Sequence, residues 1–334
     1  MKRNWLWLAG PWTLFAAIAI GWIAYWHIVA GTAEARLNAW ADEQRADGAS
    51  VQIGAIVRHG FPTLLRLELR DAAYAPARGG WRAETASLDL HVNLLNTEHI
   101  SFAATAPIAI ARSNGAVTTI AADALIASLR TRGGALAQAG IEANALTLDD
   151  ASQDGVFRVD RAVLNVRPDP RAEGSYQVAF DAEALRLPRP VRSFEAFGLD
   201  IASLRAAVVI ESGAVLINGA EGDPLGPWRD AGGKLRFEAL VLNWGPLETT
   251  GNGEGWLDDQ RRLAGELHFP IDDPARVFTA IAQGEEMSDD ARQGLRLLSA
   301  AFALSGDDIT LDAEARDGAL RLEGVRVRSL PPVY

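Results

Sequence analysis

The chain has 334 residues, a formal net charge of −11 and no cysteine. This length allows one large β-domain or two smaller ones, and the lack of cysteine excludes disulfides, thiolate metal sites and thiol catalysis. Lys2 and Lys234 are the only lysines, and the arginines are scattered singly among acids. No basic stripe could neutralise a phosphate backbone, so we expect no nucleic-acid partner.

An apolar segment near the N-terminus predicts a membrane anchor. Residues 5–30 contain no Asp, Glu, Lys or Arg, and a spanning helix needs about 20 apolar residues. Trp7 and Trp26 lie about 29 Å apart along a helix, a spacing typical of two interfacial aromatic belts. The alternative is a cleaved signal peptide, for which "VAGTAEA" offers small residues at a cleavage site. The apolar region of a signal peptide is only about 7 to 15 residues long, however, and the apolar segment of this chain is longer. We favour an uncleaved anchor.

The charges on either side of this segment predict its orientation. Lys2 and Arg3 precede it, whereas mixed charges follow it, so the positive-inside rule predicts a single-pass protein of the bacterial inner membrane with a cytoplasmic N-terminus. We therefore expect a cytoplasmic tip and anchor over 1–31, a helical stalk over 32–48 and a periplasmic β-rich domain over 49–334.

From Ser50 onward the hydrophobic pattern has a period of two, which is typical of strands with one buried face. "VQIGAIV" (51–57) and "LLRLELRD" (64–71) begin the series, and similar runs separated by Gly, Asp, Asn and Pro continue to about residue 269. A phrase with an acid, alanine and Leu-x-Leu returns irregularly at 142–148, 181–187 and 237–245. An irregular spacing argues against a propeller or a strict solenoid. It favours a long, curved antiparallel meander of roughly 16 to 20 strands.

Two helices are predicted near the C-terminus, as an insertion over about 272–303. Pro274 stands in the first turn of one helix, and Ser288 is the expected N-cap of the other. Two or three strands follow, with Asp317-Gly318 as a hairpin turn. The predicted fold class is mainly β (β-rich α+β): an N-terminal transmembrane helix, a long curved antiparallel sheet and a small C-terminal helical hairpin.

Motifs that would indicate catalysis or cofactor binding are missing. No histidine stands in G-x-S-x-G or H-E-x-x-H, and no aspartate cluster completes a calcium loop. "GNGEG" (251–255) lacks the lysine and helix of a phosphate loop, so we interpret it as a hairpin turn. We expect no enzymatic activity, no catalytic residue, no metal and no cofactor.

The stretch "RHGFP" (58–62) predicts a corner between two strands. Gly60 is free in φ, Pro62 fixes its own φ, and Phe61 can plug the end of the sheet. A corner does not require Arg58 or His59, so these two residues remain candidates for a functional role.

Two motifs carry a resemblance to known families. Arg58-x-Gly60-Phe61-Pro62 follows the first strand, and the phrase Leu240-x-Leu242-x-Trp244-Gly245-Pro246-Leu247 lies in a late strand pair. With the N-terminal helix, these motifs make the chain resemble an uncharacterised bacterial family of anchored envelope proteins, catalogued as a domain of unknown function. The chain is also similar, more distantly, to the AsmA-like superfamily of periplasmic β-rich proteins.

The resemblance to AsmA-like proteins implies a sheet curled into a groove that moves or accommodates lipids, without catalytic residues. A sheet of this many strands would be about 80 to 95 Å long, so we do not expect it to bridge an envelope alone. The predicted role is to bind lipid or another apolar envelope molecule in the concave sheet for envelope maintenance. The candidate groove lining is formed by alternate strand leucines: Leu65, Leu67, Leu69, Leu146, Leu148, Leu240 and Leu242.

Two alternatives remain open. The same leucines could be ordinary core packing. The protein could also be a scaffold or assembly factor in the envelope, holding a protein partner at its strand edges or on its helical hairpin.

Overall fold

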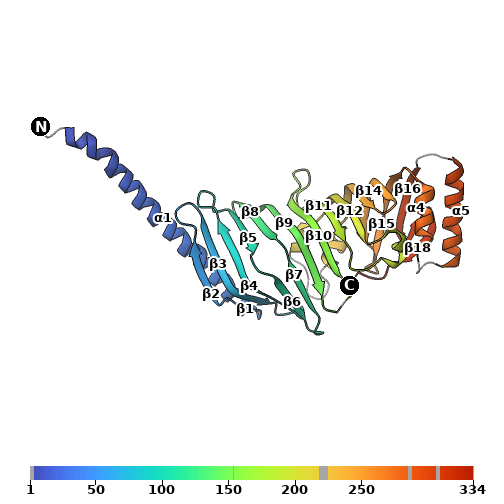
Figure 1. Cartoon of the computed structure of the whole chain (residues 1–334), viewed down its shortest axis with the longest axis horizontal. Helices are drawn as coiled ribbons and strands as arrows, with labels where there is room; N and C mark the ends of the chain where they lie inside the picture. Colours follow the sequence, from blue (N-terminus) through green and yellow to red (C-terminus); the bar gives the residue numbers. More distant parts are fainter. Residues whose placement is uncertain (1–3, 153, 218–224, 285–287, 306–308, 334) are drawn as a thin grey trace. The chain divides into compact units, whose positions relative to one another are not determined.

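The computed structural model describes residues 4–152, 154–217, 225–284, 288–305 and 309–333. Antiparallel strands dominate, with one long N-terminal helix and a helix pair near the C-terminus (Figure 1). The predicted fold class is confirmed. The chain forms two compact units, Met1–Gly133 and Gly134–Tyr334, which are described separately as unit 1 and unit 2.

The described residues of unit 1 form one helix and eight strands. These are α1 (Asn4–Ala46), β1 (Ser50–Gln52), β2 (Ala55–His59), β3 (Leu65–Ala75), β4 (Trp81–Val92), β5 (His99–Ala104), β6 (Ile108–Arg112), β7 (Val117–Ala121) and β8 (Ala124–Arg132). β1 and β2 follow one another along one edge of β3, and β4 pairs with its other edge. The far edge of β4 pairs with β5 and then β6, which in turn pair with β8 and β7.

The helix α1 packs on the strands of unit 1 through residues that recur every three or four positions and therefore lie on one face. Trp22, Trp26, Ala30 and Ala33 belong to one core cluster, whose strand members are Leu65, Leu67, Leu90, Val92, Ile56, Ile100 and Phe102, together with Leu94 of the following loop. Trp26 is only 5% exposed. It therefore packs against the strands of unit 1.

The predicted stalk is the C-terminal end of the same helix, which runs for 43 residues. This end also lies along the strands: Glu34 forms an ion pair with Arg58, and Tyr74 donates a hydrogen bond to Oε1 of Gln44 at 3.1 Å. The ring of Trp40 stacks on Tyr74. Residues 32–46 are thus attached to the sheet rather than free of it.

Unit 2 is a meander in which each strand pairs antiparallel with the next. Its strands are β9 (Ala135–Asp150), β10 (Val156–Pro168), β11 (Tyr176–Arg186), β12 (Asp200–Ile210), β13 (Leu235–Trp244), β14 (Leu247–Leu257), β15 (Leu263–Ile271), β16 (Ile309–Arg316), β17 (Ala319–Leu322) and β18 (Val325–Ser329). Its helices are η1 (Arg192–Phe197), α2 (Ala214–Ile217), α3 (Gly226–Asp230), α4 (Pro274–Ile281) and α5 (Asp289–Ser305). The turn predicted at Asp317-Gly318 joins β16 to β17.

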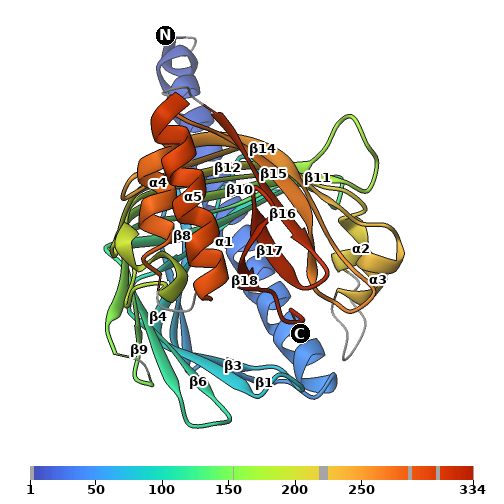
Figure 2. The same cartoon turned by 90° about the vertical axis from the view of Figure 1, so that its right-hand side faces the viewer.

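The predicted C-terminal helix pair is present as α4 and α5, which lie side by side (Figure 2). Ser288 Oγ accepts a hydrogen bond from the backbone N–H of Ala291 at 3.2 Å, so the predicted N-cap is confirmed. Phe278 and Leu295 are fully buried, in a cluster with Ile271, Leu311 and Leu322 of the strands. This pair covers the sheet at the C-terminal end of unit 2.

The interpretation of "GNGEG" as a hairpin turn was wrong. Residues 251–255 lie inside β14, and the turn is formed by Gly245 and Pro246 instead. Glycine is needed because a Cβ on Gly251 would lie 2.3 Å from Cδ1 of Phe269. The strand accommodates the close approach of its neighbour by omitting side chains.

Candidate functional site

The strand register of unit 2 gathers apolar side chains on one face of β9–β13. Residues directly opposite each other in an antiparallel pair share a face, and Leu164 lies opposite Phe180, Phe180 opposite Ala206, and Ala206 opposite Leu240. Four further rows run parallel to this one, the outermost formed by Pro168, Tyr176, Ile210 and Leu235. We call this surface the apolar face, and its larger members are Leu146, Leu148, Phe157, Val159, Leu164, Val166, Val178, Phe180, Leu185, Ile201, Leu204, Val208, Phe237, Leu240, Leu242 and Trp244.

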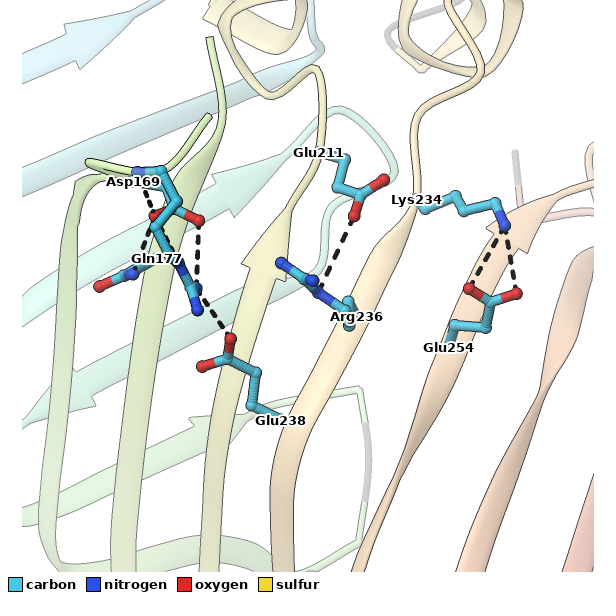
Figure 3. A network of polar contacts seen from close by, with 8 residues as sticks. Asp169, Gln177, Glu211, Lys234, Arg236, Glu238 and Glu254 are labelled. Atoms are coloured by element: carbon cyan, nitrogen blue, oxygen red, sulfur yellow. Dashed lines mark hydrogen bonds and ion pairs between the residues drawn. The ribbon is translucent and has the colours of Figure 1, made fainter. Parts of the chain in front are cut away.

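The opposite face of the same strands carries charge. Arg205 reaches Asp181 at 3.4 Å and Arg186 reaches Asp200 at 2.8 Å across strand pairs. Figure 3 shows Asp169 and Gln177 near Glu238, with Lys234 bonded to Glu254 and Arg236 paired with Glu211.

The most extensive hydrogen-bond network of this charged face surrounds Asp169, whose side chain has no exposed surface. Arg171 hydrogen-bonds Asp169 and Glu238, and these bonds lower the pKa of Asp169 and raise the pKa of Arg171. The named charges are paired with one another, so this part of the face is accounted for by ion pairs and solvent.

The apolar face is only half covered. Leu164, Ala206 and Leu240 are half-buried, and none of them belongs to a buried core cluster in the described parts of the chain. The best-covered row contains Val159, Leu185 and Ile201. A sheet face with this composition is an apolar surface on which another molecule can lie.

The structure separates the predicted groove-lining leucines into two groups. Leu146, Leu148, Leu240 and Leu242 share the apolar face of unit 2. Leu65, Leu67 and Leu69 are buried, with exposures of 0%, 0% and 4%, and Leu65 and Leu67 pack beneath Trp26 and Ala30 of α1. These three residues form core, the alternative left open above, and offer no surface to a ligand.

The "RHGFP" stretch joins β2 to β3, and the peptide bond between Phe61 and Pro62 is cis. Gly60 has a φ of 92°, where a side chain is strained, and a Cβ there would lie 2.5 Å from the carbonyl oxygen of Leu64. Phe61 does not plug the sheet: it is 51% exposed, with its ring against Trp26.

Both polar residues of the corner have structural partners. Arg58 pairs with Glu34 of α1, and Nε2 of His59 lies 2.8 Å from Oε2 of Glu68. Glu68 also accepts a hydrogen bond from Arg70 at 2.7 Å. The arrangement holds the corner and the helix together, and it presents no nucleophile.

The pair around Glu68 predicts an acid-dependent loss of stability in unit 1. Hydrogen bonds from Arg70 and His59 lower the pKa of Glu68 from 4.5 to about 2. A depressed folded-state pKa stabilises the fold fully above the unfolded value, and this contribution is lost as the pH falls from about 4.5 through about 2. Urea unfolding at several pH values is expected to show a smaller loss below pH 4.5 in Glu68→Gln than in the unmodified chain. Equal acid dependence in both would contradict the assignment.

Sequence reasoning did not predict that three aromatic residues of α1 bind the corner and the loop between β4 and β5. Trp22 Nε1 donates to the carbonyl oxygen of Pro62 at 2.7 Å, Trp26 Nε1 to that of Leu64 at 3.1 Å, and the Tyr25 hydroxyl to that of Leu94 at 2.6 Å. Their spacing of i, i+3 and i+4 places them on one helix face and is the signal that could have identified them.

Comparison with known proteins gives a single finding. The model of a bacterial family described as "Uncharacterized protein conserved in bacteria (DUF2125)" matches residues 26–331. No curated protein and no solved structure matches the chain. The matched range contains α1 from Trp26 onward and all the described strands of both units. One helix in the described residues, over Trp12–Ala46, is long and apolar enough to cross a membrane.

Proposed function

The chain belongs to this uncharacterised bacterial family, as its motifs suggested, and we propose that it is a membrane-anchored, non-enzymatic envelope protein that binds lipid or another apolar molecule. The proposed site is the apolar face of unit 2. The observation that carries the proposal is the segregation of β9–β13 into an apolar face and a charged face, with the apolar face only half covered.

The chemistry of this face suits an acyl chain or a similar apolar ligand. Its rows consist of Leu, Val, Ile, Phe, Ala and Trp, with Pro168 and Tyr176 in the outermost row, and contain no Asp, Glu, Lys, Arg or His, so a ligand would be recognised by removal of apolar surface from water. Such burial is favourable by about 25 cal/mol per Å². It selects an apolar shape rather than a particular headgroup.

The proposed location follows from the N-terminal segment. Lys2 and Arg3 on one side of the helix favour a cytoplasmic N-terminus, and the two units would then lie in the periplasm beside the inner membrane. In the proposed location, the lipids of the inner membrane are close to the apolar face and available as ligands.

The proposal that the protein is not an enzyme rests on the histidines and their surroundings. His59 lies against Glu68, and His268 Nδ1 lies 2.7 Å from Oδ1 of Asp312. Neither pair has a serine or threonine hydroxyl bonded to it in the described part of the chain. Both pairs are accounted for as side-chain contacts between neighbouring strands.

A matched pair of variants tests the lipid proposal. Leu240 and Val241 are neighbours in β13, both half-buried, and point to opposite faces. The full chain is purified from envelope membranes, and co-purifying lipid is measured by native mass spectrometry and extraction. Leu240→Asp is expected to lose most of the lipid that the unmodified chain retains, whereas Val241→Asp, which places its carboxylate beside Arg205, is expected to keep it.

Lipids that surround the anchor are common to both variants and therefore cancel. Equal lipid content in Leu240→Asp and Val241→Asp, with both variants folded, would contradict the proposal. Lipid-free protein that carries one specific polypeptide, released by Leu240→Asp, would instead assign the apolar face to a scaffold or assembly role.

A further inference from the structure

Three exposed apolar side chains lie in the two loops of unit 1 that touch α1. Phe61 is 51% exposed, Leu64 42% and Leu95 85%. Phe61 and Leu64 belong to the corner between β2 and β3, and Leu95 to the loop between β4 and β5. We call these three residues the rim. Large apolar side chains at loop tips are costly in water, so the rim indicates contact with an apolar phase.

The helix fixes where the rim lies along α1. Trp22, Tyr25 and Trp26 donate their hydrogen bonds to carbonyl oxygens of these same two loops. The rim is therefore at the level of residues 22–26. Upstream of that level Trp12, Phe15 and Ile18 are exposed by 74%, 66% and 62%, as expected of side chains that face lipid.

The length of the helix places this level at the membrane surface. This step rests on the proposed anchor. Between Lys2-Arg3 and Trp22 the helix has about 18 residues, or about 27 Å at 1.5 Å per residue, and the hydrocarbon core of a bilayer is about 30 Å thick. If Lys2 and Arg3 lie among the headgroups on one side of the bilayer, the helix reaches the other side at about Trp22. The rim, at the same level of the helix, is then at the membrane surface.

The helix side facing away from the strands extends this argument. Ile23 and Ile28 are 42% and 66% exposed, so apolar surface continues past the level of the rim. Trp22 and Tyr25 beside them are the residue types enriched at membrane interfaces, where an apolar ring and a polar group meet different surroundings.

We propose that the rim inserts into the boundary between headgroups and acyl chains of the same bilayer that α1 crosses. The ligand is the lipid surface itself. Arg58 and Arg66, the arginines near the corner, are paired with Glu34 and Asp89, so insertion depends on apolar area rather than on anionic lipid. The corner thereby sets the height at which unit 1 stands on the membrane.

The absence of cysteine makes a direct test practical. A single cysteine for a spin label is introduced at Leu95, at Ile18 or at Val117 in the full chain, which is reconstituted in phosphatidylcholine vesicles. Val117 is a matched control because it is an aliphatic side chain, 37% exposed. Val117 pairs with Ala111 of β6, and Ala111 pairs with Arg82 of β4. Arg82 lies about 33 Å along β4 from the end of the strand that leads to the rim.

Collision of the label with oxygen, which concentrates in lipid, is compared with collision with a water-soluble nickel chelate. The oxygen-to-nickel collision ratio is expected to be highest at Ile18 and lowest at Val117. At Leu95 the ratio is expected to be several-fold above that at Val117, and adding salt is expected to leave it unchanged. A ratio at Leu95 equal to that at Val117, with Ile18 in lipid, would overturn the rim and leave the anchor standing. An aqueous ratio at Ile18 would overturn the anchor and the rim together.

Discussion

Replacing Leu67 by aspartate is expected to unfold unit 1. Leu67 has no exposed surface and lies with Leu65 and Leu90 beneath Trp26. Removing a buried leucine side chain to alanine costs about 2–5 kcal/mol, and an unpaired carboxylate in its place adds a further penalty of several kcal/mol. The total reaches the typical stability of a domain, about 5–15 kcal/mol. Limited proteolysis of the full chain in detergent would show rapid cleavage between residues 50 and 133.

The same substitution at Leu95 is the control. Leu95 is a leucine of the same unit but is 85% exposed, so Leu95→Asp is expected to change the free energy of unfolding by no more than about 0.5 kcal/mol. If Leu67→Asp left the protease pattern of unit 1 unchanged, α1 would not cover Leu67. The lining role of Leu65 and Leu67 would then return to consideration.

Replacing Phe278 by alanine is expected to destabilise the C-terminal end of unit 2 by about 3–5 kcal/mol, the usual cost of deleting a buried phenylalanine ring. Phe278 is fully buried. Its ring stacks on Phe302, with 5.5 Å between centroids, and therefore joins α4 to α5. Urea unfolding followed by aromatic circular dichroism measures the change.

Leu304 provides the comparison for this second variant. It lies in the same helix pair but is 90% exposed, and Leu304→Ala is expected to shift the free energy of unfolding by less than about 0.5 kcal/mol. A loss below about 1 kcal/mol for Phe278→Ala would mean that the ring is not enclosed between the helices and the sheet.

The elements of this fold could be predicted because their signals are local. Alternation with a period of two identifies strands that have one apolar face, and Pro274 and Ser288 mark the beginnings of α4 and α5. The prediction of a turn at "GNGEG" was wrong because the signal there is not local. Glycine is typical of turns, but Gly251 is required by the ring of Phe269, a residue of the next strand that the local sequence does not identify as its neighbour.

The fate of each strand face could not be predicted, because it depends on what lies above it. Leu67 and Leu240 stand in similar alternating runs, yet α1 covers Leu67 and no core cluster encloses Leu240 in the described part of the chain. The packing of Trp26 was missed for the same reason. Its distance from Trp7 along the helix predicts only its depth in a membrane, whereas its side chain is enclosed by Leu65 and Leu67 of β3.

The meander of unit 2 has a consequence for how the protein forms. Each described strand bonds to the strands that precede and follow it in the chain, so its contacts join residues close in sequence. Low contact order of this kind favours fast folding. In the proposed periplasmic location, a strand that has just crossed the membrane would find its neighbour already in place, and unit 2 would be completed strand by strand, from β9 towards β18.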